Sequence, residues 1–251
     1  MSPTWPNPLW IAHRGAGKLA PENTLAAFRH GASHGYRAFE CDVKLSADGV
    51  PFLLHDDTLD RTTSGHGDAD GLAWSDLSRL DAGGWHSRGF AGEPPASLDA
   101  VARYVRRNGF ALNIEIKPMP KHEERTGTVV AEHARRLWAG DTRPPLLTSF
   151  KPAALQGALV GAPELPRGLL LDSLWTGWFD AARDLECKAV VSLSALLDPT
   201  LVVHLRQAGM KVLVYTVNEP AEARRLLRLQ VDGIITDAVD RFSPVEGGSD
   251  A

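Results

Sequence analysis

Short apolar runs alternate with stretches of helical periodicity along most of the chain. This alternation is typical of β/α units that build a parallel sheet. It predicts eight strands, which begin near residues 9, 37, 111, 146, 168, 189, 211 and 233. The helical periodicity predicts helices over 23–34, 97–108, 126–138, 152–160, 178–185, 199–208 and 219–229. Eight such units predict a single α/β domain, a closed (β/α)₈ TIM barrel rather than an open sheet.

The alternation is interrupted after the second predicted strand, 37–43. A turn signal at Ala47-Asp48-Gly49 precedes an extra short strand at 50–54. Residues 56–95 are then rich in Gly, Asp, Ser and Thr, with one short helical stretch. Because long connections in compact domains are usually functional, we expect 56–95 to be an inserted segment near the active site. The polar end of the chain, 243–251, predicts a flexible tail.

Composition narrows the possible partners. The chain has 251 residues, of which 43% are hydrophobic and 23% charged, with a net charge of −4. This balance is ordinary for a globular protein and indicates no affinity for nucleic acid or an anionic membrane. The first residues lack a signal-peptide pattern, and no apolar run is long enough to span a bilayer. We therefore expect a cytoplasmic protein without membrane insertion, and its oligomeric state stays open.

Charged pairs close four of the apolar runs: His13-Arg14, Glu40-x-Asp42, His55-Asp56 and Glu115-x-Lys117. In a barrel the carboxyl ends of the strands form the mouth of the active site. We therefore expect these side chains to meet in one place. Two imidazoles, several carboxylates, an Arg and a Lys suit a divalent cation and a phosphate group.

The carboxylates predict a metal site. Alternate residues of a strand share a face, so Glu40 and Asp42 project together, and Glu115 joins them from another strand. Three carboxylates form a hard oxygen site that suits Mg²⁺ or Ca²⁺ better than zinc, with Mn²⁺ also possible. Without a cation, repulsion between them would raise at least one pKa. A single E-x-D pair on a solvated surface strand is the alternative interpretation.

The histidines predict acid and base catalysis. A lone histidine at a strand end is usually structural, but His13 and His55 are each followed by a charged residue. Imidazole suits proton transfer because its pKa lies near neutrality. Arg14 offers a fork of donors to phosphate oxygens and Lys117 a point charge. For Arg14 a salt bridge to Glu22 is the alternative.

The chain also resembles a known family. The motifs that carry the resemblance run in order from residue 13 to residue 237: His13-Arg14-Gly15, Ala20-Pro-Glu-Asn-Thr24, Phe39-Glu-Cys-Asp-Val43, Asp48-Gly-Val-Pro51, His55-Asp56, Leu59-Asp-Arg-Thr-Thr63, Asn113-Ile-Glu-Ile-Lys117, Tyr215-Thr-Val-Asn218 and Asp232-Gly-Ile-Ile-Thr-Asp237. In this order and spacing they resemble the successive motifs of glycerophosphodiester phosphodiesterases. No single motif decides the resemblance, but the ordered set is highly specific.

The resemblance implies a (β/α)₈ barrel with an inserted segment after its second strand. It implies a divalent cation at Glu40, Asp42 and Glu115, and an acid/base pair at His13 and His55. The implied reaction is metal-dependent hydrolysis of a glycerophosphodiester, a small molecule, to sn-glycerol 3-phosphate and an alcohol.

The resemblance also implies substrate-binding residues. Arg14 and Lys117 are implied to contact the phosphate, and Asn23 to contact substrate or to order Arg14. Tyr215 stands where the family usually has Trp, which implies altered glycerol contacts.

Two other functions stay open. One is a lysophospholipase D-type phosphodiesterase, which would need an apolar channel beside the site. The other is a barrel that binds a phosphorylated ligand without turnover, against which the intact histidine pair argues. The leaving alcohol, the physiological cation, and the choice between a cyclic intermediate and direct attack by water also stay open.

Overall fold

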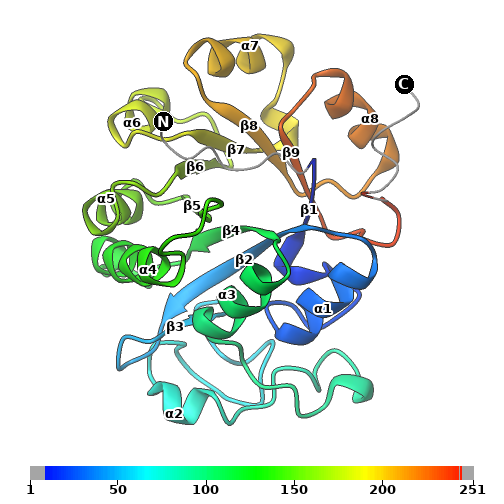
Figure 1. Ribbon diagram of the computed structural model, residues 1–251, viewed down its shortest axis with the longest axis vertical. Helices are drawn as coiled ribbons and strands as arrows, with labels where there is room; N and C mark the ends of the chain where they lie inside the picture. The colour runs from blue at the N-terminus through cyan, green and yellow to red at the C-terminus, as the bar shows by residue number, and fades with distance from the viewer. Residues whose placement is uncertain (1–8, 243, 245–251) are drawn as a thin grey trace.

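Eight parallel β-strands close into a barrel in the computed structural model, which describes residues 9–242 and 244 (Figure 1). The strands of the barrel are β1 (Trp10–Ala12), β2 (Ala38–Leu45), β4 (Ala111–Ile116), β5 (Leu146–Ser149), β6 (Arg167–Leu171), β7 (Ala189–Leu193), β8 (Lys211–Tyr215) and β9 (Gly233–Thr236). β1 closes the barrel by pairing with β9 through Trp10↔Ile234 and with β2 through Ala12↔Phe39. The predicted (β/α)₈ fold is confirmed.

Helices cover the outside of the barrel (Figure 1). They are α1 (Leu25–Ser33), α3 (Leu98–Arg107), α4 (Glu123–Leu137), α5 (Pro152–Gly161), α6 (Trp178–Asp184), α7 (Pro199–Gln207) and α8 (Pro220–Arg228). Local capping explains where several begin: the side chains of Thr24, Ser97 and Asp198 each accept a hydrogen bond from the first turn. α4 begins three residues earlier than predicted, because Glu123 and Glu124 favour the positive end of the helix dipole.

A hairpin and an irregular segment interrupt the barrel after β2. β3 (Pro51–Leu53) pairs antiparallel with β2, with Val43 opposite Leu53. The segment 56–95 follows and contains only the short helices α2 (Trp74–Leu77) and η2 (Arg88–Phe90). It lies beside β3 at one edge of the molecule (Figure 1). A small apolar cluster of its own, including Leu59 and Leu77, holds it together.

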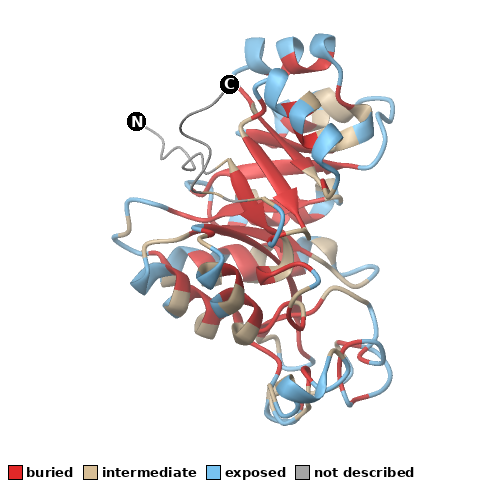
Figure 2. Cartoon of the chain, turned by 90° about the vertical axis from the view of Figure 1, so that its right-hand side faces the viewer, coloured by how far each residue is buried: buried red, intermediate tan, exposed pale blue. Residues whose placement is uncertain are grey.

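The barrel strands are buried on both faces (Figure 2). Because successive strand residues point to opposite faces, Trp10 and Ala12 pack in the large cluster that includes helix residues, while Ile11 belongs to a second cluster inside the barrel. Ala38 and Ala111 also belong to this inner cluster. Residues two or four positions further along the same strand face the barrel interior as well. These residues include Glu40 and Asp42 on β2 and Glu115 on β4.

None of the helices in the described part of the chain is both long and apolar enough to cross a bilayer. Apart from Pro244, the tail predicted at 243–251 lies outside the described residues.

Candidate active site

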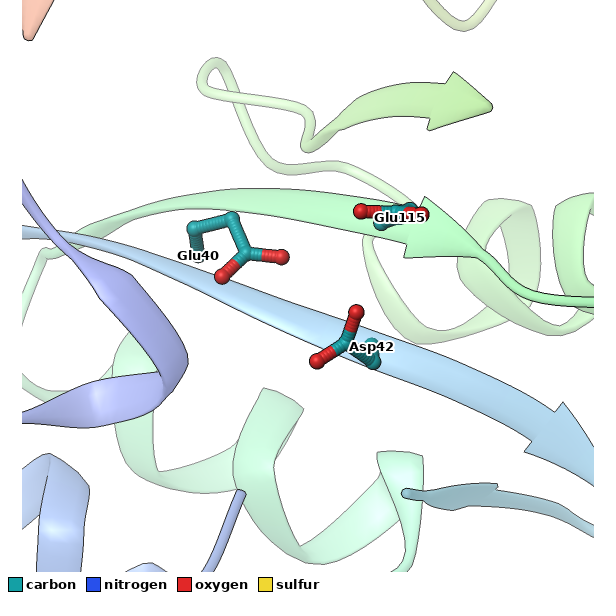
Figure 3. Close-up of side chains that lie close together, drawn as sticks. All are labelled: Glu40, Asp42 and Glu115. Carbon is teal, nitrogen blue, oxygen red and sulfur yellow. The ribbon is translucent and has the colours of Figure 1, made fainter. Parts of the chain in front are cut away.

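Three buried carboxylates converge between β2 and β4: two stand in the middle of β2, and one stands near the carboxyl end of β4 (Figure 3). The parallel register sets Asp42 opposite Glu115, and Glu40 lies two residues earlier on the same face. One oxygen from each of Glu40, Asp42 and Glu115 lies within 4.8 Å of the other two. Glu40 Oε1, Asp42 Oδ1 and Glu115 Oε1 are all buried without a hydrogen-bond partner among the described residues. The ammonium group of Lys117 approaches Glu115 Oε1 to 3.1 Å, and the close grouping of the three carboxylates fits a bound divalent cation.

The charges of this trio are strongly coupled. Burial, followed by repulsion from Asp42, raises the pKa of Glu40 well above its ordinary value and that of Glu115 to about 7. Burial alone would raise the pKa of Asp42 too, but attraction by Arg14 and Lys117 lowers it. A divalent cation would remove the repulsion, and hard oxygen donors suit Mg²⁺ or Ca²⁺.

A tight turn places the His13-Arg14 motif against the trio. The first strand, expected from the apolar run that His13 closes, ends at Ala12, and His13–Gly15 form the turn η1. Arg14 has a positive φ of 49°, and its backbone N–H donates to Glu40 Oε2 at 3.0 Å. Gly15 has a φ of 96°, and a Cβ at Gly15 would lie 2.8 Å from the Cβ of Ala27. Glycine is required here for both reasons.

Each predicted catalytic histidine is held by a carboxylate through Nδ1. His13 Nδ1 lies 2.6 Å from Asp237 Oδ1, and His55 Nδ1 lies 2.7 Å from Asp56 Oδ1. Such contacts orient the imidazole rings and leave Nε2 for proton exchange. His13 Nε2 lies 3.8 Å from Glu40 Oε2, at the edge of the acidic trio. Burial lowers the pKa of His55, although the charge of Asp42 opposes this.

Asp237 and Asn218 were not predicted as site residues. Asn218 holds Asp237 from two sides: Nδ2 donates to Asp237 Oδ2 at 3.2 Å, and Oδ1 accepts from its backbone N–H at 2.9 Å. Burial would raise the pKa of Asp237, but the hydrogen bond with His13 lowers it. The sequence signal that could have identified them is their position after predicted strands: Asn218 follows the carboxyl end of β8, and Asp237 follows that of β9.

Arg14 and Lys117 both pair with carboxylates. Arg14 Nη1 donates to Glu22 Oε1 at 2.8 Å, which is the alternative contact considered from the sequence, and its Nε lies 3.3 Å from Asp42 Oδ2. Lys117 Nζ lies 3.1 Å from Glu115 Oε1 and 3.8 Å from Asp42 Oδ1. The two cations therefore offset part of the negative charge of the trio.

Asn23 and Tyr215 take different places. The Asn23 side chain is buried, donates to Asp42 Oδ2 at 2.8 Å and accepts from the Asp42 backbone N–H at 3.1 Å. Its own N–H donates to the Arg14 carbonyl at 3.0 Å, so it supports both residues from behind. Tyr215 packs edge-on against Phe150, and its hydroxyl donates to the Leu171 carbonyl at 3.1 Å.

One pocket brings most of these residues together. It is lined by His13, Arg14, Glu40, His55, Asn113, Glu115, Lys117, Phe150, Leu170, Tyr215, Thr216 and Ile235. Its charged lining comes from η1, β2, β4 and the residues that follow β3 and β4. Its apolar wall comes from β6, β8, β9 and Phe150, which follows β5. The pocket can therefore take a ligand that is anionic on one side and less polar on the other.

Comparison with known proteins identifies relatives of this chain. The model of the glycerophosphoryl diester phosphodiesterase family matches residues 13–241. A glycerophosphodiester phosphodiesterase of Caldanaerobacter subterraneus subsp. tengcongensis is 34% identical over 236 residues, which cover 91% of this chain and 93% of that protein.

Solved structures agree with this relation. A phosphodiesterase of Oleispira antarctica, in complex with the product sn-glycerol-3-phosphate, is 32% identical with a TM-score of 0.88, covering 95% of this chain and 97% of that one. A glycerophosphodiester phosphodiesterase of Agrobacterium tumefaciens str. C58 is 32% identical with a TM-score of 0.81, covering 94% of this chain and 98% of that one.

The matched region begins at His13 and extends past Asp237, so it includes every pocket residue described above. The fold, the sequence relation and the shared length agree, and they confirm the predicted resemblance and the predicted enzyme class. The chain belongs to the glycerophosphoryl diester phosphodiesterase family.

Proposed function

We propose that this protein hydrolyses glycerophosphodiesters to sn-glycerol 3-phosphate and an alcohol, with one divalent cation held by Glu40, Asp42 and Glu115. One observation carries the proposal: three buried carboxylates, each with an oxygen within 4.8 Å of the other two, form a cluster of which Glu40 and Glu115 line the same pocket as two carboxylate-anchored imidazoles. The oxygen donors suit Mg²⁺ or Ca²⁺, and Mn²⁺ is also compatible. A bound cation would stabilise negative charge on the phosphate oxygens.

Arg14 and Lys117 are proposed to bind the phosphate. Both line the pocket, and both are paired with carboxylates of the trio or its neighbours. When a cation neutralises those carboxylates, the guanidinium and ammonium groups become available to phosphate oxygens. Arg14 offers two parallel donors and Lys117 a single charge, so the first orients the diester and the second adds attraction.

His13 and His55 are proposed to move the protons. His13 takes the proton from glycerol O2 as that oxygen attacks phosphorus, and His55 gives a proton to the leaving alcohol as its P–O bond breaks. The product of this step is a cyclic phosphate. Water then opens the ring with the two roles exchanged, and both histidines return to their starting protonation. Direct attack by water, without the cyclic phosphate, is the alternative route.

Asn23 and Tyr215 are proposed to act on the site in different ways. Asn23 orients Asp42 through two hydrogen bonds and so supports the metal site rather than the substrate. Tyr215 forms part of the pocket wall with Phe150, where a glycerol moiety would pack. The Oleispira antarctica relative was solved with sn-glycerol-3-phosphate, and we propose the same product here.

A lysophospholipid is the second candidate substrate. The loop after β6 carries Leu174 and Trp175, which are 47% and 37% exposed. The pocket residue Leu170 comes from the same strand, so this loop leaves the barrel at the mouth of the pocket. Exposed apolar side chains at the mouth would favour an apolar leaving group.

A substrate panel tests both candidates. The protein is incubated with glycerophosphocholine, glycerophosphoethanolamine and micellar lysophosphatidylcholine, with and without chelator. Glycerol 3-phosphate is measured with its dehydrogenase, and free choline is measured in parallel. Glycerol 3-phosphate released from the first two, and lost with chelator, would support the proposal. Choline released from lysophosphatidylcholine alone would favour the second candidate, and absence of turnover would favour a binding protein. The cytoplasmic location stays a prediction, which cell fractionation tests.

A further inference from the structure

Arg61, in the segment 56–95, uses all three nitrogens of its guanidinium on two carboxylates. Nη1 and Nη2 donate to the two oxygens of Glu22, each at 2.8 Å. Nη2 also donates to Asp56 Oδ1 at 2.9 Å, and Nε donates to Asp56 Oδ2. The planar fork therefore makes a paired contact on each side, which is the geometry in which arginine holds carboxylates most strongly.

Both carboxylates are also partners of pocket residues. Asp56 Oδ1 lies 2.7 Å from His55 Nδ1, and Glu22 Oε1 accepts a hydrogen bond from Arg14 Nη1 at 2.8 Å. His55 and Arg14 both line the pocket. A continuous network therefore connects a proposed proton donor to a proposed phosphate contact, and Arg61 is its central member.

The charges of the network depend on Arg61. The hydrogen bond from Arg61 is the main cause that lowers the pKa of Asp56. Burial would raise the pKa of Glu22, but Arg61 and Arg14 together lower it. Without Arg61, two carboxylates would face each other with one cation fewer. Because the Arg61 side chain is 44% exposed, solvent screening limits its effect on stability. The larger consequence is for the orientation of the groups it holds.

We propose that Arg61 is a positioning residue that orients His55 through Asp56 and Arg14 through Glu22, so that the segment 56–95 completes the active site. The inference rests on the proposed function, because it takes His55 as a proton-transfer group and Arg14 as a phosphate contact. It assigns a role to the Leu59-Asp-Arg-Thr-Thr63 motif, which had none in the proposed mechanism.

A purely structural role is the competing explanation, in which Arg61 only anchors the segment to the barrel. The protonation of His55 separates the two. Four charged side chains act on His55: Asp42, Arg14, Lys117 and Asp56. Arg61 neutralises part of the charge of Asp56, so its removal should strengthen the hold of Asp56 on the imidazolium and raise the pKa of His55. A simple anchor would change thermal stability without lowering kcat of the folded protein.

The experiment compares Arg61→Met, Arg61→Lys and a control, Arg79→Met. Arg79 lies in the same segment and is exposed, with a distant pair to Asp76 at 3.9 Å. For each variant, thermal unfolding reports stability, and glycerophosphocholine turnover coupled to glycerol 3-phosphate dehydrogenase gives kcat and KM. NMR titration follows the His55 imidazole, which His55→Gln assigns.

We expect Arg61→Met to lower kcat/KM by roughly 10–100-fold, the usual loss for groups that orient a first contact shell. Both kcat and KM should change, since His55 and Arg14 are both affected, and the NMR pKa of His55 should rise. Arg61→Lys should restore most of that pKa, because it keeps the charge, but only part of kcat, because it loses the fork. Arg79→Met should match the wild type in every measurement.

The inference is overturned if the His55 titration is unchanged in Arg61→Met. It is also overturned if an active wild type and Arg61→Met agree within about twofold in kcat/KM. A wild type that releases no glycerol 3-phosphate from any diester would instead contradict the proposed function. In that case the NMR titration, which needs no turnover, still decides whether Arg61 acts on His55.

Discussion

His13 Nδ1 lies 2.6 Å from Asp237 Oδ1, although the two residues are 224 positions apart in the chain. Closure of the barrel brings them together, because β1 pairs with β9. The carboxylate stabilises the imidazolium that forms when His13 takes a proton. We therefore expect Asp237→Asn to lower kcat by roughly 10²-fold or more, with little change in KM.

Steady-state kinetics with glycerophosphocholine checks this expectation. Asp240→Asn is the matched control, since Asp240 is exposed three residues later. A kcat for Asp237→Asn equal to that of the control would show that His13 works without its carboxylate partner.

The two histidines should act as a unit. Each of His13→Ala and His55→Ala should lower kcat by roughly 10²–10⁴-fold, because each removes one proton-transfer group. The double variant should be little worse than the more severe single variant, since groups that act together are not additive. His66→Ala is the control, because the His66 side chain is 84% exposed. Losses that multiply in the double variant would mean that the histidines act independently.

Cation binding should release protons near neutral pH. Burial and repulsion from Asp42 raise the pKa of Glu115 to about 7, so part of the protein carries a protonated Glu115 there. The cation needs the ionised form, so its affinity should rise as pH increases through about 7. Calorimetry in buffers of different ionisation enthalpy measures the released protons.

Glu115→Gln tests the source of these protons. It should weaken cation binding and reduce proton release, whereas Glu124→Gln, at an exposed position of α4, should do neither. Cation binding of equal strength from about pH 6 to 8 would contradict the pKa shift of Glu115.

The cation-free protein should lose stability as pH rises. The pKa of Glu115 is raised from its ordinary value of 4.5 to about 7, and that of Glu40 is raised as well. Between pH 4.5 and about 7 the folded protein holds more protons on these groups than the unfolded chain does. The free energy of unfolding therefore falls as pH increases. The lowered pKa of His55 has the opposite sign and acts below 6.5, so it offsets part of this fall, and the clearest loss of stability is expected near pH 7. The lowered pKa of Asp42 also has the opposite sign, but it acts below 3.8, outside this window.

Thermal unfolding in chelator across this pH range measures the effect. Adding Mg²⁺ or Ca²⁺ at high pH should raise Tm, because the ion binds only the folded state. Glu115→Gln should flatten the dependence of Tm on pH in chelator. If Glu115→Gln and the wild type showed the same dependence of Tm on pH in chelator, the raised pKa of Glu115 would be contradicted.

Local patterns predicted most of the fold. Strands that are buried on both faces give continuous apolar runs, as at Ala111–Ile116 and Ala189–Leu193, and these runs were found at the correct places. Thr24 and Ser97 cap helices near the predicted starts, because capping depends only on neighbouring residues. The turn at Arg14 was not expected from the sequence, because it is stabilised by a contact with Glu40 on another strand.

Longer-range contacts within the site could not be predicted in the same way. Nothing local marks Asp237 as the partner of His13, or Arg61 as the partner of Glu22. Each pair joins segments that are adjacent only after the barrel has closed or the segment 56–95 has folded over it.

The sequence by itself determined that Glu40 and Asp42 share one face of a strand, because side chains alternate with a period of two. Only the tertiary structure decided that Glu115 lies opposite Asp42 and that Asp237 reaches His13. Periodicity is a property of the local backbone. Register and closure instead depend on packing among all the strands and helices, which no single segment encodes.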